Sequence, residues 1–113
     1  MYSLYNNDMF DIFPTIEEKS IDLIFIDLPY NTTNCKWDVE VDLENFWKES
    51  KRVLKDNGVV IATAQIPFSI KLGMSNLKDL KYEWIWEKTQ GTGHLNAKKM
   101  PMKCHENILI FYK

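Results

Sequence analysis

The residues best suited to chemistry stand together as Asp27, Leu28, Pro29 and Tyr30. The carboxylate of Asp27 accepts hydrogen bonds, and the backbone carbonyl of Leu28 offers a second acceptor whose direction Pro29 fixes. The ring of Tyr30 presents a flat face on which a planar ligand can stack. Together these groups could bind a planar ligand that carries a hydrogen-bond donor.

A buried strand positions this tetrapeptide. Residues 21–27 form a short, isoleucine-rich run, which predicts a buried parallel strand. Pro29 cannot donate to a sheet and disfavours helical geometry at Leu28, so the strand must end here. The tetrapeptide therefore lies at the carboxyl end of a strand, the edge at which open α/β sheets bind ligands. A structural role is the alternative, in which Asp27 only caps the turn by accepting bonds from backbone amides.

The rest of the chain alternates helices and strands. The pattern predicts a short helix capped by Asp8, a helix that starts at Asp42 and stops at 56–58, a strand over 59–64, a helix over 68–80, a strand over 82–88 and a last strand over 106–112. Such alternation indicates an α/β fold with right-handed crossovers and a mostly parallel sheet. Because no helix joins the last two strands, we expect them to form an antiparallel hairpin at the sheet's end.

Composition limits the possible functions. The chain has 113 residues, which is enough for one domain, and a formal net charge of −2, which argues against a dedicated nucleic-acid-binding module. The nearby lysines Lys98, Lys99 and Lys103 fit a solvated loop and a phosphate contact equally well. Cys35 and Cys104 are far apart and predict free thiols rather than a disulfide or a zinc site. Neither a signal peptide nor a membrane span is evident, so we expect a cytoplasmic protein. Because the cysteines and histidines show no short ligand spacing, we also expect no bound metal.

Two loops carry further candidates. The polar loop that follows Tyr30 is longer than most connections, and such loops tend to be functional. Trp37 within it could stack on a ligand, but packing as an anchor is the favoured interpretation. The loop over residues 89–105 ends at His105 and Glu106, which could lie near a site or tie the loop down by hydrogen bonds; we favour the second. Residues 91–93 lack the third glycine and the helix of a dinucleotide-binding turn, which indicates only loop flexibility.

The tetrapeptide resembles the Asp-Pro-Pro-Tyr signature of S-adenosylmethionine-dependent DNA amino-methyltransferases, the DNA methylase N-4/N-6 family, with Leu28 in place of the first proline. The order of segments around it is similar to adenine-methylating enzymes of phage and bacterial type. These segments are Asn31-Thr32-Thr33, Trp37-Asp38, the aromatic strand over 82–88 and the run over 103–111. An aspartate at the first position, rather than the serine common in cytosine-N4 enzymes, favours adenine.

The resemblance implies a site-specific DNA adenine-N6 methyltransferase with a partial Rossmann-like methyltransferase fold. It would transfer a methyl group from S-adenosylmethionine to a base flipped out of double-stranded DNA, in a bacterial or phage-infected cell. The implied catalytic residues are Asp27, Leu28, Pro29 and Tyr30; the implied substrate-binding residues are Tyr30, Asn31, Thr32, Thr33 and Trp37; the implied cofactor-binding residues are Asp8 and Asp27.

One part of the family pattern is missing, since no strand here is followed by a Phe-Xaa-Gly-Xaa-Gly-type turn. In a permuted group of the family the catalytic half comes first, so residues 1–113 are expected to form that amino-terminal half as a single subdomain. The outer edge of the strand over 21–27 would then be open, which promotes association. A complementary half, self-association, or an inactive remnant that binds DNA or a partner are the open alternatives. A cytosine-N4 or non-DNA amino-methyltransferase is a further one.

Overall fold

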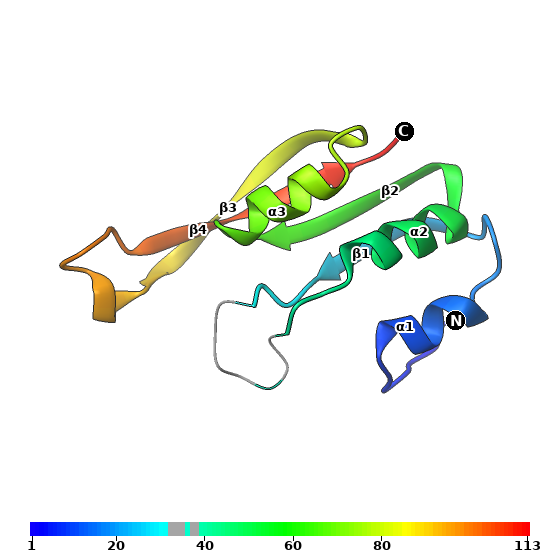
Figure 1. Cartoon of the computed structure of the whole chain (residues 1–113), viewed down its shortest axis with the longest axis horizontal. Helices are drawn as coiled ribbons and strands as arrows, with labels where there is room; N and C mark the ends of the chain where they lie inside the picture. Colours follow the sequence, from blue (N-terminus) through cyan, green and yellow to red (C-terminus); the bar gives the residue numbers. More distant parts are fainter. Residues whose placement is uncertain (32–35, 37–38) are drawn as a thin grey trace.

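One four-stranded sheet forms the centre of the molecule. The structure, a computed structural model, describes residues 1–31, 36 and 39–113. The strands are β1 (Ile21–Asp27), β2 (Leu54–Ala64), β3 (Leu80–Thr92) and β4 (Lys103–Phe111), in the spatial order β1-β2-β4-β3 (Figure 1). β1 is parallel to β2, whereas β4 is antiparallel to both β2 and β3. β1, β2 and β3 therefore run in one direction and β4 in the other, which confirms the predicted α/β class and its antiparallel hairpin.

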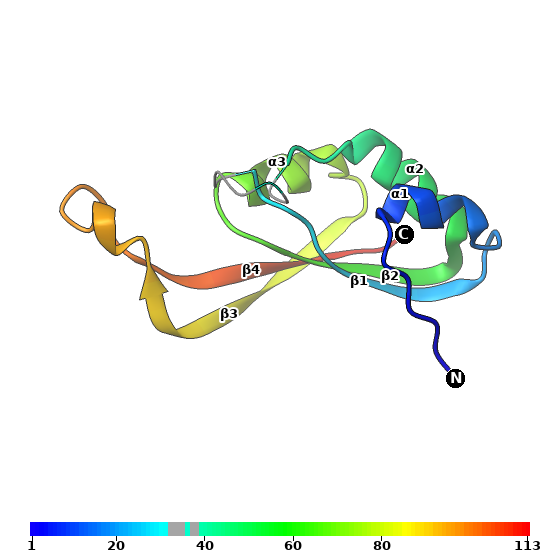
Figure 2. The same cartoon turned by 90° about the horizontal axis from the view of Figure 1, so that it is seen from below.

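The helices lie on one face of this sheet. They are α1 (Met9–Ile12), α2 (Leu43–Val53) and α3 (Phe68–Ser75), and Figure 2 shows all of them above the strands. Short 3₁₀ turns, η1 (Phe13–Thr15) and η2 (His94–Asn96), follow α1 and β3. Asp8 and Asp42 cap α1 and α2 as predicted, since their carboxylates accept bonds from backbone amides of the first turn. No helix in the described part of the chain is long and apolar enough to cross a membrane.

The core lies between this helical layer and the sheet. α2 contributes Phe46 and Val53, which are almost fully buried against Leu72 of α3 and Phe111 of β4. Trp47 packs its ring against Phe111, and its Nε1 donates to Ser75 Oγ at 2.7 Å, which joins α2 to α3. The buried side chains of α2 lie at helical spacing, and this apolar face holds both helices on the sheet.

Several predicted boundaries were wrong. Residues 56–58 do not stop α2, which ends at Val53, but form a bulge inside β2: Ile21 of β1 pairs with Leu54, and Leu23 pairs with Val59. Gly58 suits this bulge because a Cβ there would lie 2.8 Å from Leu54 Cδ2.

Further along the chain, α3 is shorter and the hairpin longer than predicted. α3 ends at Ser75 instead of continuing to residue 80. β3 continues to Thr92 and β4 starts at Lys103, so much of the predicted loop over 89–105 is strand. The sequence did not reveal this pairing because the two strand ends, taken separately, are polar.

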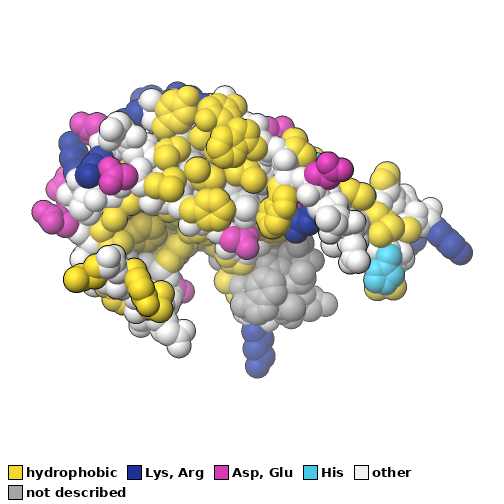
Figure 3. Space-filling model, turned by 180° about the vertical axis from the view of Figure 1, so that it is seen from behind, with side chains coloured by type: hydrophobic (Ala, Val, Ile, Leu, Met, Phe, Trp, Pro, Cys, Tyr) yellow, Lys and Arg dark blue, Asp and Glu magenta, His cyan; other side chains and the backbone are white. Residues whose placement is uncertain are grey.

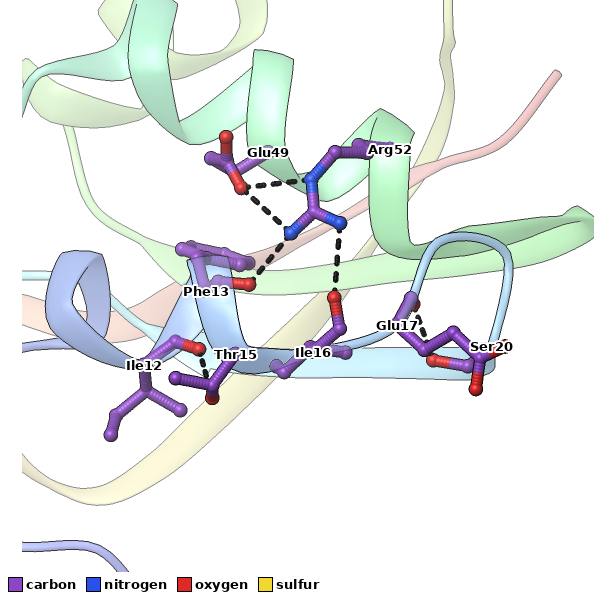
Figure 4. A network of polar contacts seen from close by, with 8 residues as sticks. All are labelled: Ile12, Phe13, Thr15, Ile16, Glu17, Ser20, Glu49 and Arg52. Carbon is purple, nitrogen blue, oxygen red and sulfur yellow. Dashed lines mark hydrogen bonds and ion pairs between the residues drawn. The ribbon is translucent and has the colours of Figure 1, made fainter.

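A polar cluster around Arg52 fastens the amino-terminal segment to α2 (Figure 4). The guanidinium of Arg52 donates to the backbone carbonyls of Phe13 at 2.7 Å and Ile16 at 2.9 Å. It also forms an ion pair with Glu49 at 3.0 Å. We call these four residues the Arg52 cluster; it holds the segment that leads into β1.

The opposite face of the sheet carries no helix and is rich in apolar side chains (Figure 3). Phe25, Ile61, Ile110 and Tyr82 pair in register across the four strands, so they share this face. Phe25 is 65% exposed and Tyr82 is 47% exposed. β1 is an edge strand that pairs only with β2 among the described residues. A bare apolar face thus adjoins an open strand edge.

Candidate active site

Asp27 lies at the carboxyl end of β1, where the sequence placed it. Its partner in the sheet is Thr63 of β2, whose hydroxyl donates to Asp27 Oδ1 at 2.6 Å. Thr63 is 4% exposed, whereas Asp27 itself is exposed. A buried hydroxyl therefore orients the carboxylate, while the carboxylate still reaches solvent. Among the described residues no backbone amide donates to Asp27, and the amides of residues 32–35 in the loop that it was predicted to cap lie outside that part of the chain.

The next two residues shape the turn. Leu28 is 3% exposed and packs in the core beside Ala64 and Phe68. Pro29 follows without a backbone donor, so the chain leaves the sheet here. Burying the Leu28 side chain anchors the turn by the hydrophobic effect, which explains why a leucine can replace a rigid proline at this position.

Tyr30 is held at two points. Its ring stacks on Phe68 with centroids 5.2 Å apart and an interplanar angle of 21°. Its hydroxyl donates to Glu106 Oε1 at 2.6 Å. Burial, and then the bond to Glu106, raise the pKa of Tyr30 far above its usual range, so the phenol stays protonated. With one ring face on Phe68, the opposite face is the one that a ligand could use.

Glu106 reaches this site from β4. Its second carboxylate oxygen forms an ion pair with Lys88 of β3, and the residue is 8% exposed. Burial alone would raise the pKa of Glu106, but the bonds from Lys88 and Tyr30 outweigh it and lower that pKa, so the carboxylate is charged. We call Asp27, Thr63, Tyr30, Glu106 and Lys88 the β1-end cluster; it joins residues from all four strands or their ends.

A cavity of about 220 Å³ opens beside the ring of Tyr30. Pro29, Pro67 and Phe68 line it, and an ion pair of 2.7 Å between Glu40 and Lys71 stands at its edge. Flat apolar walls with a few polar groups are typical of sites for planar ligands. The cavity therefore offers a volume for a ring beside Pro29 and Tyr30, which directly follow the predicted acceptors Asp27 and Leu28 in the chain.

The structure places the other predicted site residues differently. Asn31 borders the same cavity. Thr32, Thr33 and Trp37 lie outside the described residues. Asp8 uses its carboxylate to cap α1, and within the described chain no hydrogen bond links it to the β1-end cluster. The assignments of all these residues stay predictions.

Sequence reasoning missed three residues of the site: Thr63, Phe68 and Lys88. Thr63 could have been noticed, because it is a lone hydroxyl in an apolar run. Its partner could not, because Asp27 lies 36 residues away in the sequence. Phe68 and Lys88 looked like ordinary helix and strand residues. Glu106 was singled out for tying down the loop over 89–105, but its contacts in the structure are with Tyr30 and Lys88.

Only one side of a cofactor site can be built from these residues. The exposed carboxylate of Asp27 stands at the end of β1, next to the open outer edge of that strand. A glycine-rich turn that would cradle a nucleotide-like cofactor is missing from the sequence. The residues present could therefore contact such a cofactor but could not enclose it.

Comparisons with known proteins agree with this arrangement. The N6/N4 methyltransferase family model, described as DNA methylase, matches residues 21–113. None of the curated proteins matches the sequence significantly. At under 25% identity, the solved structures described below are evidence of a shared fold.

Three solved structures illustrate the likeness. The complex of M1.HpyAVI with S-adenosylmethionine has a TM-score of 0.65 at 16% identity, over 94% of this chain and 53% of that one. The cytosine-N4-specific PvuII DNA methyltransferase has a TM-score of 0.69 at 12% identity, over 96% and 48%. TTHA0409 from Thermus thermophilus, provisionally classed as a DNA modification methylase and bound to S-adenosyl-L-methionine, has a TM-score of 0.63 at 21% identity, over 91% and 52%. The chain spans about half the length of these structures.

Proposed function

We propose an activity from one premise: the chain belongs to the DNA methylase family, whose model matches residues 21–113. The proposal is that it forms the catalytic half of a DNA adenine-N6 methyltransferase, with S-adenosylmethionine as methyl donor and double-stranded DNA as substrate. The observation that supports it best is Asp27, an exposed carboxylate at the end of β1 that Thr63 orients at 2.6 Å.

The chemistry needs an activated amine. The exocyclic nitrogen of adenine is a poor nucleophile because its lone pair is delocalised into the ring. Hydrogen bonds from this amine to the Asp27 carboxylate and the Leu28 carbonyl would favour a tetrahedral nitrogen with a directed lone pair. S-adenosylmethionine would supply the electrophilic methyl group: its bond to sulfur would break as the bond to nitrogen forms, which leaves a neutral thioether. The methylated nitrogen would then release its proton to the Asp27 carboxylate or to water.

Tyr30 and the cavity beside it would receive the base. An enzyme that acts on an atom inside the duplex must flip the nucleotide out of the stack. The face of Tyr30 opposite Phe68 offers a stacking surface, and the cavity of about 220 Å³ offers space for a ring. Asn31, Thr32, Thr33 and Trp37, which follow Tyr30, are proposed to contact the same nucleotide.

The preference for adenine rests on Asp27. A carboxylate accepts two hydrogen bonds more strongly than a serine hydroxyl, the residue common at this position in cytosine-N4 enzymes. Cytosine-N4 methylation is the alternative within the family, and PvuII shows that this fold supports it. Nucleoside analysis of methylated DNA by mass spectrometry separates the two products directly.

The remaining half of the active site is proposed to come from a complementary methyltransferase half. The matched structures are about twice as long as the region this chain covers in them. The open edge of β1 and the adjacent apolar face around Phe25, which is 65% exposed, provide a surface for it. Asp8 and Asp27 are proposed to contact the cofactor that this half holds.

Methyl transfer tests the proposal. The tagged chain is purified from its own host under mild conditions, so that a bound partner stays with it, and is supplied with plasmid DNA and methyl-labelled S-adenosylmethionine. We expect N6-methyladenine, and a loss of about 100-fold or more for Asp27→Ala. The matched control is Asp22→Ala, which removes an exposed carboxylate from the start of the same strand. Activity that survives Asp27→Ala refutes the role of Asp27.

A subunit that binds DNA or a partner without catalysing methylation is the second candidate. The observation in its favour is that the described residues form only one side of a cofactor site. Calorimetric titration of the isolated chain with S-adenosylmethionine distinguishes the two. Saturable binding supports autonomous catalysis, and no heat at millimolar ligand excludes it for the chain alone.

A further inference from the structure

We propose that Glu106 is a positioning residue for methyl transfer, because it fixes the hydroxyl and hence the ring plane of Tyr30 at the end of β1. The inference rests on the proposed function, since it concerns how Tyr30 would meet the target base. Glu106 lies 76 residues after Tyr30, so only the folded sheet brings the two together. A contact of such range, built between two buried or half-buried side chains, is specified by the fold.

The carboxylate of Glu106 is held by both oxygens. Oε1 accepts the Tyr30 hydroxyl at 2.6 Å, and Oε2 forms the ion pair with Lys88. The Glu106 side chain is only 11% exposed. A carboxylate bound at both oxygens and shielded from water has a single orientation, so it offers Tyr30 one fixed acceptor.

Two contacts together fix the plane of the Tyr30 ring, which neither contact would fix alone. Stacking on Phe68, at 5.2 Å between centroids, restrains the ring of Tyr30 along one direction but allows it to slide and tilt. The bond from its hydroxyl to Glu106 fixes the far end of the ring. The ring of Tyr30, which lines the cavity, is thereby held at a fixed angle, and a base stacked on its free face would inherit that angle relative to Asp27.

Lys88 stabilises this arrangement. A buried carboxylate without a partner would be costly in free energy, and the Lys88 ammonium compensates its charge. Lys88 also lies 4.3 Å from the centroid of Trp86, whose ring supports it from β3. The low pKa of Glu106 agrees with this, since the group stays ionised as a strong acceptor.

A purely structural role is the competing interpretation, in which Glu106 only ties β4 to the turn after β1. Both interpretations predict some loss of stability when Glu106 is replaced. They differ in what happens to Tyr30 in a protein that is still folded. The decisive readout must therefore come from Tyr30 itself.

Nuclear magnetic resonance of the full chain with ring-labelled tyrosine provides that readout. The chain has 5 tyrosines, and Tyr30→Phe assigns the Tyr30 signal by its loss. We expect Glu106→Ala to shift the Tyr30 signal, Glu106→Gln to restore it in part because the amide oxygen still accepts, and the exposed-site control Glu87→Gln to leave it unchanged. A Tyr30 signal that does not move in folded Glu106→Gln and Glu106→Ala overturns the proposal.

Kinetics give a second readout in the partner-bound enzyme. We expect Glu106→Ala to lower kcat about tenfold with the KM for the methyl donor unchanged, since Tyr30 is proposed to contact the base and not the donor. Adding Tyr30→Phe should cause no further loss, because the hydroxyl already lacks its acceptor. Losses that multiply contradict the proposal. If the wild type itself transfers no methyl group, the proposed function fails, and the tyrosine signal still decides the role of Glu106.

Discussion

The Arg52 cluster and the β1-end cluster both tie a loop to the body of the fold, but they use different acceptors. Arg52 donates to the backbone carbonyls of Phe13 and Ile16, whose positions the chain itself determines (Figure 4). In the β1-end cluster the hydrogen bonds join side chains, from Thr63 to Asp27 and from Tyr30 to Glu106. The first arrangement holds the main chain, and the second holds side chains that chemistry could use.

This difference separates stability from function. Side-chain pairs are adjustable and are worth little for folding when one member is exposed, as Asp27 is. Backbone carbonyls that lose a buried donor cannot turn away to find another. We therefore expect replacements in the Arg52 cluster to change the free energy of unfolding most, and replacements in the β1-end cluster to change activity most.

Arg52→Met should have the largest effect on stability. It removes the Arg52 donor from the carbonyls of Phe13 and Ile16, of which only Phe13 keeps a second donor among the described residues, the backbone N–H of Ile16. It also leaves Glu49 without its partner, and we expect a loss of about 2 kcal/mol. Urea denaturation followed by tryptophan fluorescence measures it. The control is Lys48→Met, which removes an exposed positive charge from the same helix. Equal midpoints for the two variants would contradict the distinction.

Thr63→Val should have the opposite effect, with a small change in stability and a large loss of activity. Valine keeps the shape of threonine in the buried strand, and Asp27 can exchange its lost bond for water, so stability should change by less than about 1 kcal/mol. Methyl transfer should fall about tenfold, because the Asp27 carboxylate is no longer oriented. Thr63→Ser restores the donor and should recover most of the rate. If Thr63→Val unfolded readily but transferred methyl groups at the normal rate, the proposed difference between the two clusters would be wrong.

The two clusters also differ in how far the sequence predicts them. The position of the tetrapeptide 27–30 at the end of β1, the cap at Asp8 and the helix start at Asp42 were predicted correctly because their signals are local: a strand ended by proline, and acidic residues before helices. The partners of Tyr30 were not, because Phe68 of α3 and Glu106 of β4 approach it only in the folded molecule, Glu106 by the insertion of β4 between β2 and β3. The prediction that residues 56–58 end the helix was wrong for a different reason, since a bulge and a helix stop use the same residue types.

Acid should weaken the β1-end cluster by protonating Glu106. The pKa of Glu106 is lowered in the folded state from the ordinary glutamate value of 4.5. Its contribution to stability is therefore complete above pH 4.5 and is lost as the pH falls through the lowered folded value. We expect the stability difference between wild type and Glu106→Gln to shrink over that range in urea titrations. A difference that stays constant with pH would show that the charge of Glu106 contributes nothing.

The smallest effect is expected at Asp56, which forms ion pairs with Lys19 and Lys113 at 3.5 Å each. Unlike the contacts of the other clusters, these are exposed, since the Asp56 side chain is 74% exposed. The charge of Lys19, and then that of Lys113, lower the pKa of Asp56, but solvent screens this attraction. Asp56→Asn should leave the unfolding midpoint unchanged, and carboxyl chemical shifts should show the Asp56 pKa rising toward 3.8 in concentrated salt. A clear loss of stability in Asp56→Asn would mean that exposure does not decide which polar clusters hold this fold.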